Sequence, residues 1–281
     1  MASTKEHESR LWRKVCIITG AGSEIGLGRA TAWTFAKNGA RAVYITDFRD
    51  ELLPQLAKDI NAKYPNVQVI PRKVDAASEE SVKAIVKESI DTFGRLDVFF
   101  ANAGTAVFTR FQDIEVSNFM NVMRVNTLSV FLAIKYASAA MKIADGRSDK
   151  EKSCGSIIAT ASVAGLRNGA GPMDYSASKA AVINLAQTGA WELYGTNVRV
   201  NAICPGLFET GMTKALFDAA RIRGSQDKIG QLNPMRRAGV TEEVANLVVF
   251  LASDESSYVN GQAYAVCGGL SASHPITPGK L

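Results

Sequence analysis

The sequence predicts an α/β protein in which one doubly wound parallel sheet is flanked by helices. Three observations favour this fold class: short apolar runs alternate with longer helical patterns, a glycine-rich turn follows the first apolar run, and 281 residues that are 47% hydrophobic suffice for one large core. The regular alternation leaves no room for a second domain. We therefore expect a polar N-terminal extension over residues 1–13, a single domain over residues 14–270 and a tail over residues 271–281.

Each element follows from its local pattern. Strands are expected where short apolar runs stand between turn residues, and helices where apolar residues recur every three or four positions. Ser78 offers good N-terminal chemistry for one helix, which should end near Gly94. The expected strands cover residues 15–19, 42–47, 67–74, 96–101, 155–162, 199–204 and 261–266, and the expected helices cover residues 26–38, 51–63, 78–93, 116–142, 173–194 and 241–252.

Composition argues against several classes of function. The net charge of +5 arises from scattered basic residues, so nucleic-acid binding is not expected. Four cysteines without paired spacing and two histidines offer no metal cluster and suit a reducing compartment. Neither a signal peptide nor an apolar run of membrane-spanning length is found, which predicts a cytoplasmic protein without a membrane partner. The C-terminal Gly279-Lys280-Leu281 distantly matches a Ser-Lys-Leu peroxisomal signal, so peroxisomal import is the alternative.

The turn from Gly20 to Gly26 predicts a phosphate-binding site. Its glycines let the backbone approach a pyrophosphate closely, and the free N–H groups of the following helix favour negative charge. Asp47 ends the next strand about twenty residues further on, at the position that faces an adenosine ribose. Because Asp47 also precedes a helix, helix capping is its alternative role.

A second group of residues predicts proton transfer. Positions i and i+4 of a helix lie on the same face, so the ammonium of Lys179 can sit beside the phenol of Tyr175. A nearby cation lowers the pKa of a tyrosine, which is near 10 when unperturbed, and so suits it to act as a general acid/base. Ser162, at the exit of a strand, would hold the substrate oxygen.

Taken together, these motifs resemble the short-chain dehydrogenase/reductase family. The resemblance extends over about residues 14–270 and implies a Rossmann fold, an NAD(P)-dependent oxidoreductase and a secondary alcohol or ketone as substrate. The motifs that carry it, in the order of the family, are the glycine turn, Asn102-Ala103-Gly104, Thr160-Ala-Ser162, Tyr175-Ser-Ala-Ser-Lys179 and Pro205-Gly206.

The resemblance also implies a role for each residue of the site. Tyr175 moves the proton, Lys179 lowers its pKa and holds ribose hydroxyls, Ser162 positions the substrate oxygen and Asn126 maintains a proton relay. Asp75 and Ala76 would border the adenine, and Phe208 and Thr210 the nicotinamide carboxamide. The full set expected around the cofactor is Gly20, Ser23, Ile25, Gly26, Asp47, Phe48, Asp75, Ala76, Asn102, Ala103, Gly104, Tyr175, Lys179, Pro205, Gly206, Phe208 and Thr210.

One residue departs from the pattern of the family, which is Thr-Gly, three residues and then Gly-x-Gly. Counted from Gly20, Glu24 stands where the second glycine belongs. A carboxylate near a pyrophosphate is unfavourable, so Glu24 should either point outward or weaken cofactor binding.

Three longer segments carry further expectations. The pattern over residues 116–142 predicts one almost uninterrupted, mostly buried helix that contains Asn126, for which a hydrogen-bonded core asparagine is the alternative role. Residues 207–235 are interpreted as a mobile lid on the substrate side. The polar loop over residues 144–153 receives no function.

The carboxylate of Asp47 favours NAD over NADP, because it would repel the 2′-phosphate of NADP. Two other functions stay open: an NADPH-dependent ketone reductase of a biosynthetic pathway, and a dinucleotide-binding protein without redox activity. We also expect a homo-oligomer, a tetramer or a dimer, because the helix over residues 173–194 carries small side chains on which a second helix can pack, namely Ala177, Ala180, Ala181 and Ala190.

Overall fold

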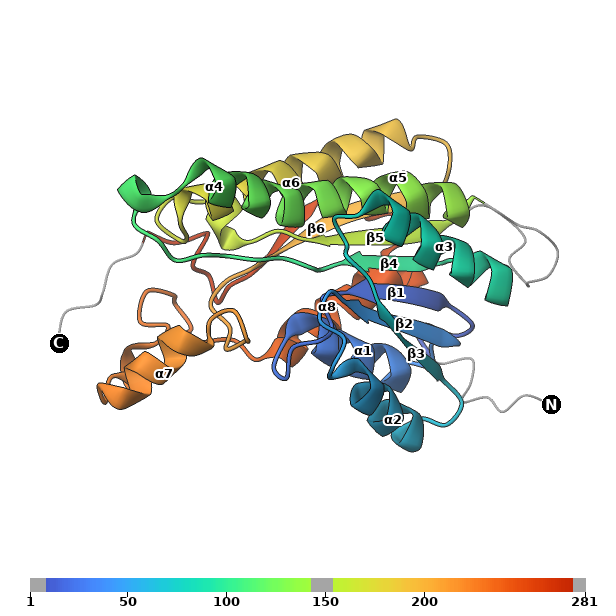
Figure 1. Ribbon diagram of the computed structural model, residues 1–281, viewed down its shortest axis with the longest axis horizontal. Helices are drawn as coiled ribbons and strands as arrows, with labels where there is room; N and C mark the ends of the chain where they lie inside the picture. The colour runs from blue at the N-terminus through green and yellow to red at the C-terminus, as the bar shows by residue number, and fades with distance from the viewer. Residues whose placement is uncertain (1–8, 143–153, 275–281) are drawn as a thin grey trace.

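The computed structural model describes residues 9–142 and 154–274 and confirms a doubly wound parallel sheet (Figure 1). Its seven strands are parallel to their neighbours and follow the order β3-β2-β1-β4-β5-β6-β7. They are β1 (Val15–Thr19), β2 (Ala42–Asp47), β3 (Gln68–Lys73), β4 (Val98–Ala101), β5 (Gly155–Thr160), β6 (Val198–Pro205) and β7 (Ala263–Val266).

Helices cover both faces of the sheet (Figure 1). One face carries α1 (Leu27–Lys37), α2 (Leu53–Lys63) and α8 (Thr241–Ala252), and the other carries α3 (Glu79–Phe93), α4 (Val116–Met123), α5 (Ser129–Met141) and α6 (Met173–Glu192). The remaining helix, α7 (Lys214–Ile222), extends beyond these two layers.

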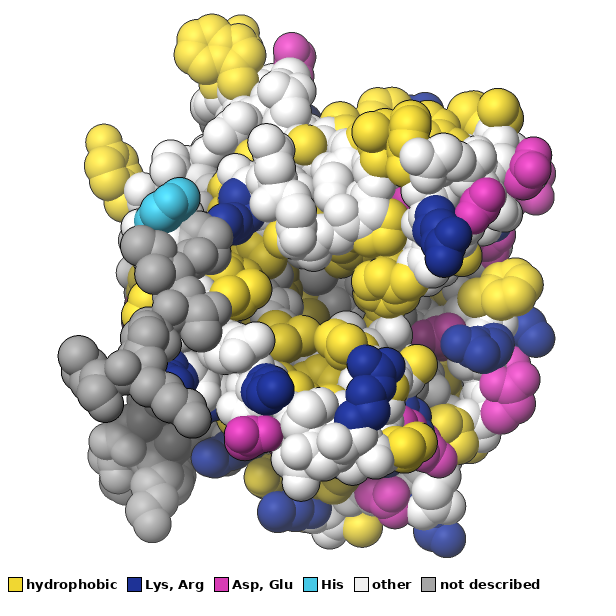
Figure 2. Space-filling model, turned by 90° about the vertical axis from the view of Figure 1, so that its left-hand side faces the viewer, with side chains coloured by type: hydrophobic (Ala, Val, Ile, Leu, Met, Phe, Trp, Pro, Cys, Tyr) yellow, Lys and Arg dark blue, Asp and Glu magenta, His cyan; other side chains and the backbone are white. Residues whose placement is uncertain are grey.

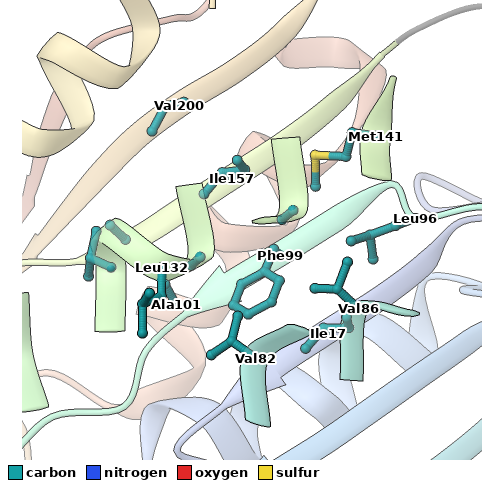
Figure 3. Packing of buried hydrophobic residues seen from close by; sticks show 14 of the residues in the cluster. Ile17, Val82, Val86, Leu96, Phe99, Ala101, Leu132, Met141, Ile157 and Val200 are labelled. Atoms are coloured by element: carbon teal, nitrogen blue, oxygen red, sulfur yellow. The ribbon is translucent and has the colours of Figure 1, made fainter. Parts of the chain in front are cut away.

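Two hydrophobic clusters fill the spaces between the sheet and its helices. Because both faces of the sheet are covered, β1 and β6 are buried along their whole length, including the polar Arg199 and Asn201 of β6. Figure 3 shows Phe99 of β4 among Val82 and Val86 of α3 and Leu132 of α5. Burying an aromatic ring of this size stabilises the fold by roughly 2 kcal/mol.

Most elements lie within two or three residues of their predicted bounds, and both ends of α3 are as expected. The Ser78 side chain accepts a hydrogen bond from the N–H of Ser81, and Gly94 ends the helix with a φ of 72°. The predicted uninterrupted helix over residues 116–142 is wrong, because a π-helical turn over Arg124–Leu128 separates α4 from α5. The loop over residues 144–153 and the last three residues lie outside the described residues.

The sheet order determines where a ligand can bind. The chain leaves β3 at one edge and returns to the middle of the sheet as β4, next to β1. The connections after β1 and β4 therefore diverge to opposite faces, and the carboxyl ends of these two strands open a crevice between them.

Candidate active site

A cleft of about 660 Å³ lies at the carboxyl ends of the central strands. It brings together residues from six of the seven strand exits, those of β1 to β6. The residues expected at the cofactor and the reacting atoms that line it are Gly20, Ser23, Ile25, Gly26, Asp47, Phe48, Asp75, Ala76, Asn102, Ala103, Gly104, Ser162, Tyr175, Lys179, Pro205, Gly206, Phe208 and Thr210. Of the predicted set, only Asn126 is not among the lining residues, and it is completely buried.

The glycine turn is longer than a count from Gly20 suggests. Gly20 has a φ of 72°, and a Cβ atom on Gly28, in the first turn of α1, would lie 2.4 Å from the Gly20 carbonyl oxygen. Gly26 and Gly28 therefore form the Gly-x-Gly pair at the helix start, and five residues, 21–25, precede it instead of three. The assignment of Glu24 to a glycine position was wrong. Glu24 is exposed, does not line the cleft and points outward.

Asn102 connects three strand ends. Its side-chain Nδ2 donates to the carbonyl oxygens of Thr19 and Gly20 at 3.0 and 3.1 Å, and its Oδ1 accepts from Thr160 Oγ1 at 3.1 Å. Thr19 Oγ1 in turn accepts from the N–H groups of Asn102 and Ala103, both at 3.0 Å. The contributions of Thr19 and Thr160 were missed, although each is a hydroxyl residue at the last position of a strand that neighbours β4.

Ser162 and Tyr175 meet at the mouth of the cleft. Ser162 is buried directly after β5, where its Oγ accepts from the N–H of Ala164 at 3.1 Å. Burial raises the pKa of Tyr175, and a hydrogen bond with Ser162 opposes that shift. In the absence of ligand, Tyr175 is thus a neutral phenol at neutral pH.

Lys179 lies beneath Tyr175. Its Nζ donates to the Thr160 carbonyl oxygen at 2.7 Å and lies 5.6 Å from the centroid of the Tyr175 ring. Burial of the ammonium lowers the pKa of Lys179 to about 8. The spacing of the pair correctly predicted its proximity, but the expected lowering of the Tyr175 pKa by Lys179 is not found here, because burial outweighs the other influences on the phenol.

Asn126 occupies the centre of the π-helical turn. Its Oδ1 accepts from the N–H of Thr105 at 2.8 Å, and its Nδ2 donates to the Thr105 carbonyl and to Ser178 Oγ at 3.0 and 2.9 Å. A Cβ atom on Gly104 would lie 3.3 Å from this Oδ1 and 3.4 Å from Lys179 Nζ. Asn126 therefore connects the exit of β4 to the helix that carries Tyr175, with Gly104 between it and the lysine.

Asp47 closes the opposite end of the cleft. Its carboxylate accepts from the N–H groups of Gly22 at 2.8 Å and Arg49 at 3.0 Å. The alternative of helix capping is wrong, because α2 begins only at Leu53 and has Leu52 at its N-cap. Asp47 instead attaches the end of β2 to the glycine turn while it lines the cleft.

The wall from Pro205 to Thr213 is held by its own hydroxyl groups. Thr213 Oγ1 accepts from the N–H of Thr210 at 2.9 Å and donates to the Phe208 carbonyl oxygen. The Phe208 side chain is buried against Gly239. Mobility of the predicted lid stays a prediction.

Comparison with known proteins shows similarity along nearly the whole chain. A family model described as enoyl-(acyl carrier protein) reductase matches residues 20–271. The chain is 37% identical to 3-oxoacyl-(acyl-carrier-protein) reductase of Thermotoga maritima, over 93% of this chain and 99% of that protein. It is 35% identical to mitochondrial borneol dehydrogenase of Lavandula x intermedia, over 93% and 92% of the two chains.

A third relative shares its name with a solved structure. Levodione reductase of Leifsonia aquatica is 33% identical over 98% of this chain and its whole length. The crystal structure of levodione reductase covers 94% of this chain with a TM-score of 0.83. Within the described ranges, no helix is long and apolar enough to cross a membrane, and no group of His, Cys, Asp and Glu side chains could hold a metal ion.

The depressed pKa of Lys179 predicts a pH-dependent stability. The folded protein releases this proton near pH 8, whereas the unfolded chain keeps it until about pH 10.4. Stability rises with pH wherever the unfolded chain binds more protons, so between about pH 7.5 and about pH 9.5 the wild type should gain about 2 kcal/mol relative to Lys179→Met. Urea unfolding of both proteins without coenzyme measures this difference. A relative gain below about 0.5 kcal/mol would contradict the depressed pKa.

Proposed function

Because the chain belongs to the short-chain dehydrogenase/reductase family, we propose that it transfers a hydride between NAD and a secondary alcohol or ketone. One observation carries this proposal: Ser162, Tyr175 and Lys179 converge on the cleft whose other end is formed by the glycine turn and Asp47. A protein that only bound a dinucleotide would not require these polar groups at the far end.

The cleft has the features that a dinucleotide requires. The first turn of α1 has no side-chain cap within the described structure, so its N–H groups are available to a pyrophosphate. Gly20, Gly22 and Gly28 leave the backbone uncovered where added Cβ atoms would meet other backbone atoms within 3 Å. The outward position of Glu24 removes the objection that a carboxylate would face the phosphates.

When bound, the nicotinamide supplies the hydride acceptor or donor. Ser162 positions the substrate oxygen, and Tyr175 exchanges the proton with that oxygen. A phenol of raised pKa is protonated in the resting protein and ready to donate in the direction of ketone reduction. Lys179 holds ribose hydroxyls and stabilises the phenolate that Tyr175 becomes, while Asn126 keeps the neighbouring backbone in place for a proton relay.

An NADPH-dependent reductase of a biosynthetic pathway is the second candidate. It is favoured by the 37% identity to a relative named for the reduction of 3-oxoacyl groups on acyl carrier protein. The coenzyme test described below separates this candidate from the first. The 2′-phosphate of NADPH would need a basic partner near Asp47. Arg124 is paired with Asp75 at 3.1 Å, so Arg49 is the basic lining residue that remains near Asp47.

Tyr175→Phe should reduce turnover by about a hundredfold or more, the usual scale for the loss of a general acid/base. Dinucleotide affinity and the melting temperature should change little, because the ring and its packing remain. Steady-state kinetics and coenzyme fluorescence titration measure these quantities. Tyr194→Phe, on an exposed tyrosine outside the cleft, is the matched control. Turnover of Tyr175→Phe within twofold of the wild type would exclude Tyr175 from the mechanism.

The wild type should prefer NAD over NADP by about tenfold or more in kcat/KM, because the Asp47 carboxylate would repel the 2′-phosphate of NADP. A tenfold preference corresponds to about 1.4 kcal/mol, which one such repulsion readily supplies. Asp47→Ser combined with Phe48→Arg should reverse the preference, because Phe48 lines the cleft and is 65% exposed. Asp50→Ser removes a carboxylate outside the cleft, paired with Lys73, and should leave the ratio unchanged. A wild-type preference for NADP would instead support the second candidate.

We further propose that the chain forms a homo-oligomer through the layer of α4, α5 and α6. Ala177 and Ala180 are exposed on α6, and the large apolar side chains of Val116, Met120 and Phe131 are exposed on α4 and α5. Light scattering at micromolar concentration should report a tetramer or a dimer. A monomer under these conditions would contradict the proposal.

A further inference from the structure

The two ends of the cleft differ in charge. At the end formed by β2 and β3, four charged side chains line the wall: Asp47, Arg49, Asp75 and Arg124. Around Ser162 and Tyr175, the only charged lining residue is Lys179, which is buried and donates to the Thr160 carbonyl. The substrate end of the described cleft thus presents a hydroxyl and a phenol but no charged side chain free to pair with a substrate.

The loop over residues 163–172 connects Ser162 to the helix that carries Tyr175, and none of its residues lines the cleft. Arg167 of this loop donates to the carbonyl oxygens of Leu270 and Ser273 and is therefore occupied. Asp174, which follows the loop in α6, is buried and accepts from the N–H of Tyr175 at 2.8 Å. Leu166, on this loop, is exposed although it is apolar. Gly171 packs closely on Tyr175: a Cβ atom at this glycine would lie 3.0 Å from Cδ1 of the Tyr175 ring.

The segment that leads into α7 forms the opposing wall, and its charges pair with one another. Arg221 contacts the carboxylates of Glu209 and Asp218 at 2.5 and 2.9 Å, and Lys214 contacts Asp218 at 2.5 Å. Thr210 and Thr213 also line the cleft from this wall, and the Thr213 hydroxyl is occupied by the Phe208 carbonyl and the N–H of Thr210. Met212 is the apolar lining residue between them and is 38% exposed. Leu216 follows one helical turn later and is 55% exposed.

The space-filling view (Figure 2) shows how side chains of each type are distributed over this face of the molecule. Figure 2 shows a hollow on the face at the left of Figure 1, with hydrophobic side chains within it and both hydrophobic and basic side chains along its rim. Scattered exposed apolar residues need no explanation, but apolar residues concentrated around a catalytic hollow indicate the chemistry of the ligand that covers them.

We propose that the substrate is an uncharged ketone or alcohol with a mainly apolar body, such as a substituted alicyclic ring, and that Met212 provides an apolar contact that selects it. This inference rests on the proposed function of the site. A substrate carboxylate or phosphate would lose water here without gaining a cationic partner, which is unfavourable. An apolar ring would instead cover exposed hydrophobic surface, and the flexible thioether of Met212 adapts to its shape.

Two ketones that differ in one group test the inference: 4-methylcyclohexanone and 4-oxocyclohexanecarboxylate. Calorimetry on the protein saturated with NAD⁺ measures binding alone, because a ketone does not react with the oxidised coenzyme. The methyl ketone should bind at least tenfold more tightly than the carboxylate. The positive nicotinamide ring of NAD⁺ attracts the carboxylate. Saturation with NAD⁺ is therefore a demanding condition under which to find weaker binding of the carboxylate. Equal or tighter binding of the carboxylate, or no binding of the methyl ketone, overturns the inference.

A charge introduced into the wall tests the role of Met212. Met212→Lys should tighten binding of the carboxylate by about tenfold and weaken binding of the methyl ketone, because the wall then offers a cation. Ile222→Lys is the matched control, since Ile222 is 87% exposed at the end of α7 and does not line the cleft. If both variants shift the two affinities equally, Met212 does not select the substrate.

Turnover is measured separately so that the two proposals can fail independently. Oxidation of NADH by 4-methylcyclohexanone supports both. Tight binding of this ketone without turnover leaves the inference standing and contradicts the proposed function for this substrate class. Faster turnover of the carboxylate than of the methyl ketone supports the oxidoreductase and overturns the inference.

Discussion

The alignment of the strand ends at β1, β4 and β5 is the constraint on which the site depends. Where a parallel sheet ends, backbone groups lose their neighbours on the adjacent strands and need other partners. Thr19, Asn102 and Thr160 supply these partners across the three exits. Leaving such a group unpaired costs about 1–3 kcal/mol when it is buried, so the three side chains hold the exits in register. The floor of the cleft is thus an extension of the sheet.

The residues proposed to react are attached to this floor. Lys179 donates to the carbonyl of Thr160, the residue whose hydroxyl binds Asn102, and the phenol of Tyr175 lies above Lys179. Asn126 makes a second attachment through Thr105 and Ser178, between the exit of β4 and the helix α6. Two independent sets of hydrogen bonds therefore fix α6 relative to the sheet, as the proposed role of Tyr175 as a proton donor requires.

The sequence was sufficient for the fold and for the residues that line the cleft, because both follow from local patterns and from the rule that ligands bind at the carboxyl ends of parallel strands. It was insufficient where a distant residue decides the outcome. The π-helical turn contains Asn126, which bonds to Thr105 about twenty residues away, and helical periodicity cannot reveal such a contact. The pKa of Tyr175 is likewise set by burial, whereas the spacing from Lys179 predicts only that the two are close.

The glycine turn shows how a longer loop can keep the packing of a motif while it obscures the spacing of that motif. Packing identifies Gly28 as the residue that must lack a side chain, and the five residues 21–25 then form a longer connection above it. This connection contacts the opposite wall: the N–H of Gly211 donates to the Ile25 carbonyl at 2.8 Å, and a Cβ atom on Gly211 would lie 2.5 Å from Ser23 Oγ. Because Met212 follows directly, the wall proposed to contact the substrate begins beside the turn proposed to bind phosphate. Ser23 and Ile25, which do not fit the fixed spacing of the motif, therefore join the two ends of the cleft.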